Sequence, residues 1–112
     1  MKPRLLALTV LCAIALAVTG GQVAASAAGG KTVTLRNIAF SPKKLSIKRG
    51  TTVTFAFRDD TTAHNVVSKG PKRFKNIGVR SSGSQKRTFT AAGVYRYVCS
   101  LHPGMSGQIT VH

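Results

Sequence analysis

Three side chains that can bind a metal recur near the end of the chain. Cys99, His102 and Met105 lie at three-residue intervals, and a further histidine, His64, lies well upstream of them. Two imidazoles, one thiolate and one thioether form the donor set of a mononuclear blue-copper site, with Met as the weak axial ligand. We therefore expect these four side chains to bind one copper ion.

The methionine decides between copper and zinc. Zinc also binds cysteine and histidine tightly, but its structural sites use these two residue types alone. A thioether adds little to a zinc site, whereas soft sulfur donors favour copper, particularly Cu(I).

Each of the four residues also has an ordinary explanation when it is taken singly. His64 could be a loop histidine, Met105 a filler of the core, and Cys99 a small buried apolar residue. The spacing Cys-x-x-His-x-x-Met in one short stretch makes the joint pattern much harder to explain without a metal.

The first 27 residues have the pattern of a secretory signal peptide. Lys2 and Arg4 precede an apolar run over residues 5–18, and the small residues between Ala25 and Ala28 offer cleavage sites. This order of features is typical of a leader, and the run is short for a membrane span. An N-terminal anchor that is retained is the alternative. We expect residues 28–112 to form one small domain that is periplasmic or extracellular.

Removal of the leader leaves a single cysteine. Cys12 lies inside the leader, so Cys99 has no partner for a disulfide within the chain. A lone thiol in an exported protein is normally liable to oxidation, so its presence calls for a function. Metal binding beside His102 supplies one.

The chain is strongly basic, with 17 Lys and Arg against two acidic residues and a formal net charge of +15. Such a surface can simply keep a small domain soluble, or it can steer the protein toward an anionic partner or membrane surface. Nucleic acid is a poor candidate, because the compartment is wrong and no basic, aromatic-rich motif of a nucleic-acid-binding fold is present.

The mature part of the chain reads as strands separated by turns. Apolar and polar residues alternate in six stretches, and a short apolar stretch follows His64. Residues 68–83 show no such alternation. We interpret them as a long loop that could contain one short strand or helical turn. About seven short strands without a helical period predict an all-β, antiparallel β-sandwich. The six alternating stretches are 31–37, 44–48, 51–58, 84–90, 94–99 and 107–112.

The predicted strands place the metal-binding residues at one end of the sandwich. Cys99 ends one strand and residue 107 begins the next, so the residues between them form a tight loop shaped by Pro103 and Gly104. His64 comes from a different strand end. Its neighbour Asn65 is either a turn residue or a group that ties the two loops together.

These motifs resemble the cupredoxins of the plastocyanin, pseudoazurin and amicyanin group. The resemblance rests on the Cys99-to-Met105 motif, the His64-Asn65 pair and the Tyr95-x-Tyr97 strand, and it extends over residues 31–112. The two-residue gap between His102 and Met105 is most similar to that of amicyanin. The resemblance implies a Greek-key sandwich with a type 1 copper bound by His64, Cys99, His102 and, weakly, Met105.

The resemblance also implies one-electron transfer between larger redox proteins. Nothing else in the sequence suggests catalysis, because Asp59 and Asp60 are the only carboxylate side chains and three histidines are too few for a multicopper oxidase. The alternative is a protein with the same ligands that stores, buffers or delivers copper. A basic surface-binding sandwich with a vestigial site is a third interpretation.

Docking is expected at the metal end and at the most basic stretch of the chain. The chain as a whole is much more basic than is usual for the group. The edge of His102, with Pro103, Gly104 and Phe40, is the expected apolar contact for a redox partner. The partner itself is expected to be acidic or to lie at an anionic membrane surface, and the chain to be a monomer. The basic loop that would speed encounter contains Lys69, Lys72, Arg73 and Lys75.

Overall fold

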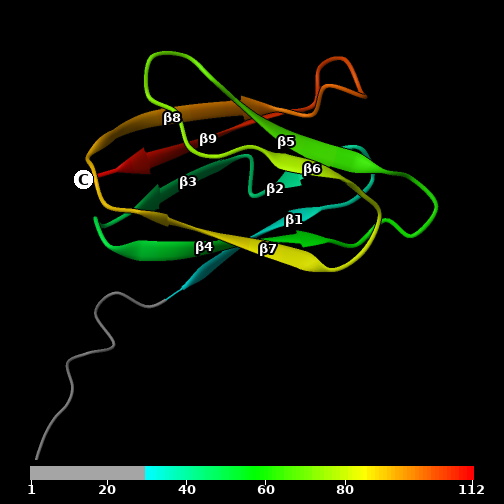
Figure 1. The fold of residues 1–112 in the computed structure, drawn as a ribbon, viewed down its shortest axis with the longest axis horizontal. Coiled ribbons are helices and arrows are strands. Elements are labelled where there is room, and N and C mark those ends of the chain that lie inside the picture. The colour runs from blue at the N-terminus through cyan, green and yellow to red at the C-terminus, as the bar shows by residue number, and fades with distance from the viewer. Residues whose placement is uncertain (1–29) are drawn as a thin grey trace, which may run out of the picture.

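The computed structural model describes residues 30–112, and they form two sheets packed face to face (Figure 1). The predicted signal peptide lies outside the described residues. No helix that is long and apolar enough to cross a membrane occurs in the described part. The nine strands are β1 (Lys31–Leu35), β2 (Phe40–Ser41), β3 (Lys44–Ile47), β4 (Thr51–Phe57), β5 (His64–Lys69), β6 (Ile77–Arg80), β7 (Ser84–Phe89), β8 (Gly93–Val98) and β9 (Ser106–Val111).

One sheet has the strand order β2-β1-β4-β7, and the other has the order β3-β9-β8-β5-β6. The predicted all-β sandwich is confirmed. The strands are not all antiparallel, because β1 pairs with β4 and β3 pairs with β9 in parallel. The two strands beyond the expected number are the two-residue β2 and the short β6, which lies within the predicted long loop.

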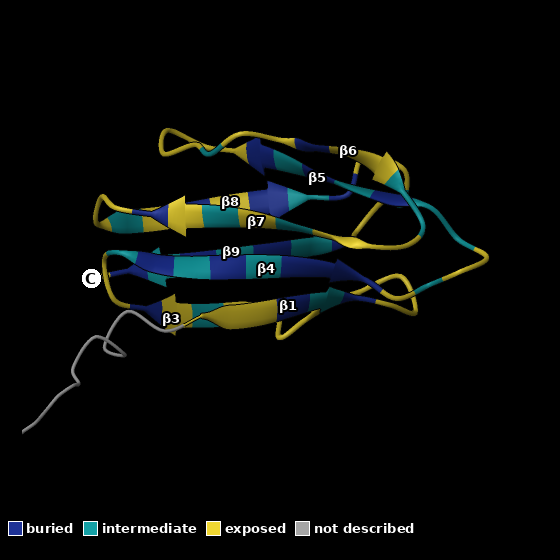
Figure 2. Cartoon of the chain, turned by 60° about the horizontal axis from the view of Figure 1, so that its bottom comes forward, coloured by how far each residue is buried: buried dark blue, intermediate teal, exposed yellow. Residues whose placement is uncertain are grey.

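Alternation of burial explains why these segments form strands. Along β9 the pattern is strictly alternating, and β4 is buried or half-buried along its whole length (Figure 2). Side chains on successive strand residues point to opposite faces, so the apolar half of each strand meets the facing sheet. By contrast, β6 is mostly exposed and carries little periodicity.

Tyr97 on β8 is the largest fully buried side chain of the core. Its ring lies edge-on to Phe40 and Phe55, with ring centroids 4.8 Å and 5.6 Å away, and Phe74 closes the cluster at 5.9 Å. Phe40 is only 4% exposed. The expectation that Phe40 belongs to an exposed docking patch is therefore wrong, because β2 turns its ring into the core.

The hydroxyl of Tyr97 is buried without a hydrogen-bond partner in the described structure. Burial raises the pKa of Tyr97 above its ordinary value of 10.0, because the phenolate would lose its hydration. In the unfolded chain the phenol deprotonates near its ordinary pKa, so unfolding is favoured as the pH rises past that value.

We expect Tyr97→Phe to raise the free energy of unfolding by about 1 kcal/mol at neutral pH, because it removes an unpaired buried hydroxyl. The gain should grow above pH 10, where the wild-type chain alone carries the cost of keeping this phenol protonated. Urea unfolding of both proteins between pH 7 and pH 11 measures the difference. A variant that is less stable at every pH would show that the hydroxyl is satisfied.

Candidate metal centre

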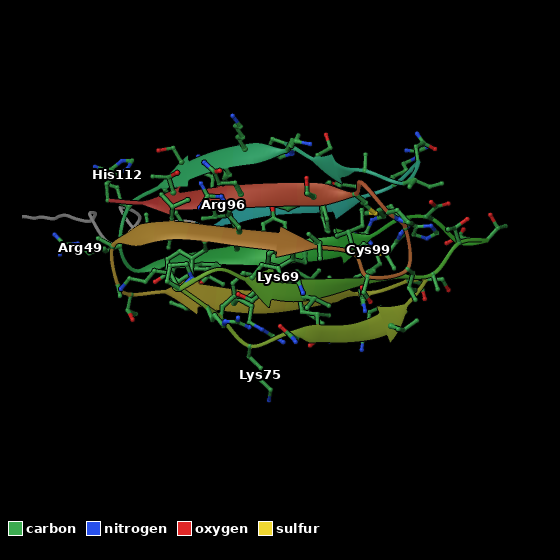
Figure 3. All side chains as sticks on the ribbon, turned by 90° about the horizontal axis from the view of Figure 1, so that it is seen from above. Arg49, Lys69, Lys75, Arg96, Cys99 and His112 are labelled. Atoms are coloured by element: carbon green, nitrogen blue, oxygen red, sulfur yellow. The ribbon has the colours of Figure 1, made fainter. Side chains whose placement is uncertain are left out.

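The structure places the two segments that carry the expected metal ligands at the same end of the sandwich. The loop that leads from β4 to β5 and the loop between β8 and β9 lie together, opposite the C-terminus (Figure 1). Cys99 marks this end in Figure 3, whereas Arg49 and His112 mark the other. His112 is therefore remote from the site.

His64 is the first residue of β5, and its side chain is fully buried. The strand fixes its backbone, and Asp59 fixes its ring, with 3.0 Å between Nε2 of His64 and Oδ2 of Asp59. An ionised carboxylate can only accept a hydrogen bond, so Nε2 carries the proton. In the neutral imidazole, the form that binds a metal, the other ring nitrogen, Nδ1, then has its lone pair free, and it lies 3.9 Å from the sulfur of Cys99.

Two backbone hydrogen bonds close the loop from Cys99 to Met105. The amide of Cys99 donates to the carbonyl of Met105 at 2.9 Å, and the amide of Met105 donates to the carbonyl of His102 at 3.1 Å. Gly104 turns the chain with a φ of 87°, a conformation that glycine adopts without strain. Cys99 and Met105 are each 3% exposed, so both sulfur side chains point into the protein.

His102 lies half-buried on this loop, and its Nε2 lies 3.0 Å from the carbonyl oxygen of Ala63. A carbonyl oxygen only accepts, so Nε2 donates and Nδ1 is left free, as in His64. The rings of the two histidines are 4.9 Å apart between centroids. Both imidazoles are thus held by protein acceptors on the side away from their free nitrogens.

Three donor atoms converge at this point. One ligand atom each from His64, Cys99 and His102 lies within 4.8 Å of the others. Met105 belongs to the same buried cluster as Cys99. A thiolate and two imidazoles at this separation fit a small soft metal ion, and copper suits this set best.

Asn65 connects the two loops that carry the donors. Its amide nitrogen donates to the hydroxyl of Ser100, and the backbone amide of Ser100 donates to the Asn65 carbonyl, both at 2.8 Å. This pair of hydrogen bonds ties the His64 and Cys99 segments together, and it limits the movement of one donor relative to the other.

Asp59 is the residue that the sequence alone did not place in the site. Two features of the sequence could have pointed to it. Asp59 lies five residues before His64, and it is one of only two residues with a carboxylate side chain. A carboxylate that holds the far nitrogen of a metal-binding histidine orients the ring and increases its basicity.

We expect Asp59→Asn to weaken copper binding by about 10- to 100-fold, because the amide holds the His64 ring less firmly and polarises it less. Asp60→Asn is the matched control, since Asp60 is exposed and loses the same charge. Titration with a competing chelator measures both affinities. Equal losses in the two variants would assign the effect to net charge rather than to the hydrogen bond.

Some of the residues expected for docking are exposed, and another makes hydrogen bonds within its own loop. Pro103 and Gly104 are exposed beside the half-buried His102, and Lys69 and Lys75 are exposed. Arg73 instead holds its own loop, since its guanidinium donates to the carbonyl oxygens of Gly70 and Ser68 at 3.0 Å and 3.4 Å.

Comparison with known proteins agrees with this geometry. Residues 6–111 match the family model of the cupredoxin-like domain. Amicyanin-alpha of Methylorubrum extorquens is 33% identical over 88 residues, which cover 75% of this chain and 73% of that protein. This chain therefore belongs to the cupredoxin-like family, and the resemblance noted in its sequence is confirmed.

Two solved structures extend the comparison. The purple cupredoxin of Nitrosopumilus maritimus is 29% identical with a TM-score of 0.65, over 73% of this chain and 99% of that one. A copper-containing nitrite reductase of Thermus scotoductus is 34% identical with a TM-score of 0.63. The match covers 73% of this chain but 22% of the reductase, so this chain spans only about a fifth of that enzyme. Copper is the metal of the family, and the donors described above fit it.

Proposed function

We propose that this protein is an exported electron carrier that passes one electron at a time between redox partners. His64, Cys99 and His102 would be the strong ligands of its copper and Met105 the weak axial one. The copper supplies a one-electron couple between Cu(II) and Cu(I). The observation that carries the proposal is the fixed position of the donors, since both imidazoles are hydrogen-bonded at Nε2 and the sulfur ligands are buried.

A rigid donor set suits electron transfer because the ligands do not have to move when the charge of the metal changes. Asp59, the Ala63 carbonyl and the Asn65–Ser100 pair together hold the two loops in place. Burial of Cys99 keeps water away from the thiolate. The described residues contain one cluster of three metal-binding side chains, and we infer that the chain carries electrons rather than catalysing a reaction.

The competing function is copper storage or delivery with the same ligands. A delivery protein must release copper in one oxidation state, whereas an electron carrier retains it in both. Reduction and reoxidation in the presence of a copper chelator distinguishes the two functions. We expect the copper content to stay constant over many cycles, and loss of copper on reduction would favour delivery.

The exposed apolar residues at the metal end support docking there. Leu101 is 44% exposed beside Pro103 and Gly104, and it lies on the same loop as His102. The His102 ring is half-buried at this surface, so electrons would leave the copper through this ligand. The lysines near the β5 end, among them Lys69 and Lys75, would speed encounter with an acidic partner.

We expect Pro103→Glu to slow electron transfer to the partner by about tenfold or more, because it places a charge in the apolar contact. Stopped-flow mixing with the reduced partner measures the rate, and the copper spectrum of the variant should be unchanged. An unchanged rate would exclude this end as the docking surface.

A further inference from the structure

A row of cationic side chains crosses the outer face of the five-stranded sheet. Lys44 on β3 pairs with Gln108 on β9, Gln108 pairs with Arg96 on β8, and Arg96 pairs with Lys69 on β5. Directly paired residues of neighbouring strands have their side chains on the same face. Lys44, Arg96 and Lys69 are all exposed, so the row faces solvent.

The row lies along a pocket rather than on a flat surface. A depression of about 220 Å³ is lined by the whole row and by Lys43, which reaches the hydroxyl of Ser106 at 3.3 Å. The lining also includes Val98, the residue that precedes Cys99. In Figure 3, Lys69 and Arg96 lie in the middle of this face and Cys99 lies at its end.

No carboxylate side chain balances these charges. The chain has only Asp59 and Asp60, which lie in the loop before β5, and Asp59 is engaged with His64. Like charges placed directly opposite each other on adjacent strands destabilise a sheet. The Arg96–Lys69 pair therefore costs stability in the free protein, and an anion bound between the two side chains would relieve that cost.

We propose that this pocket binds an acidic segment of the redox partner, with at least two carboxylates of the segment placed along the row. The proposal rests on the proposed function, because it assigns a second contact to the same partner. Neighbouring strands are about 4.8 Å apart, so the row from Lys44 to Lys69 extends about 14 Å across the sheet. One phosphate or sulfate is too small to contact all three cations, whereas three carboxylates on alternate residues of an extended segment span about 13 Å, close to the length of the row.

The uncharged member of the row adds specificity. Gln108 lies between Lys44 and Arg96 in the row and offers an amide that donates to a carboxylate without adding charge. A segment bound here would lie over β8, the strand that ends next to Cys99, and would position the partner relative to the copper loop.

The test measures binding of a fluorescein-labelled hexaglutamate peptide to the copper-loaded protein at low ionic strength by anisotropy. We expect the double variant Lys69→Gln/Arg96→Gln to bind about tenfold more weakly or worse, because it removes two charge-assisted hydrogen bonds. The matched control is Lys31→Gln/Lys86→Gln, which removes the same charge from exposed positions on β1 and β7. The control should bind within about twofold of the wild type.

A second readout uses thermal stability. Saturating hexaglutamate should raise the Tm of the wild type and of the control variant, because a ligand that binds only the folded state stabilises it. The Tm of Lys69→Gln/Arg96→Gln should rise clearly less at the same peptide concentration, because this variant binds the peptide more weakly. Equal weakening of peptide binding in the two double variants would overturn the proposal and leave net charge as the cause.

Two further arms separate other anions from the acidic segment. Inorganic phosphate that displaces the peptide at equal concentration would overturn the proposal in favour of a single-oxyanion site. Vesicles of phosphatidylglycerol that bind through the row while the peptide does not would overturn it in favour of a membrane surface. The copper absorption and its cycling are recorded on the same samples, so a failure of electron transfer is seen separately from a failure of peptide binding.

Discussion

Replacing Cys99 with serine should abolish the intense visible absorption of the copper-loaded protein and weaken copper binding by more than about 100-fold. Loss of a group that merely orients a ligand costs about 10- to 100-fold in affinity, so loss of a strong ligand must cost more. Serine keeps the size of the side chain but offers a hydroxyl in place of a soft thiolate. The donor set would then retain the two imidazoles and the thioether alone.

The control for this substitution is Met105→Leu, which keeps the volume of a side chain that is buried with Cys99. A weak axial ligand tunes the reduction potential without supplying the charge-transfer band, so this variant should remain intensely coloured. Chelator competition and visible spectra of the two variants check the assignment. Retention of the band in Cys99→Ser would exclude Cys99 as the ligand responsible for it.

Gly107→Ala should lower the free energy of unfolding by about 1–3 kcal/mol, and by more if the core cannot adjust. A Cβ atom on Gly107 would lie 2.5 Å from Cε1 and 2.6 Å from Cζ of Tyr97, its direct partner across the sheet. The Tyr97 ring cannot move aside, because Phe40, Phe55 and Phe74 surround it. For a domain of this size the Tm should fall by about 4–8 °C for each kcal/mol lost.

The same clash should reach the metal site, since Gly107 follows Met105 by two residues and Tyr97 precedes Cys99 by two. Gly78→Ala is the matched control, because a Cβ there meets no atom within 4 Å and should change the Tm little. Adding Tyr97→Leu to Gly107→Ala should cost less than the sum of the two single losses, because the atoms that clash are gone. Strict additivity in this cycle would show that the two residues do not interact.

The sequence predicted the strands that bury one of their two faces. It did not predict the strands with little periodicity or the direction in which strands pair. Alternation marked β4, β8 and β9 to within a residue at most of their ends. The mostly exposed β6 and the two-residue β2 have too little periodicity to detect. Parallel pairing of β1 with β4 leaves no local signal, because the period of two is the same in either direction.

In the site, too, the features set by residues close together in the chain could be predicted, and those set by loop folding or strand register could not. Spacing alone was enough to predict that Cys99, His102 and Met105 would share a loop, since they are close in the chain. The hydrogen bond from Asp59 to His64 depends on how the loop before β5 folds back, and the Lys44–Gln108–Arg96–Lys69 row exists only through strand register. Phe40 was misplaced because residues 38–42 break the alternation, so its direction could not be inferred.

The absorption spectrum of the copper-loaded, oxidised protein, followed through reduction and reoxidation, tests the central claim most directly. A copper bound by one thiolate and two imidazoles with a weak axial thioether predicts an intense band near about 600 nm. The band should disappear on reduction and return on reoxidation with all the copper retained. A colourless copper-loaded protein, or one that loses its copper during the cycle, would contradict the proposed electron carrier.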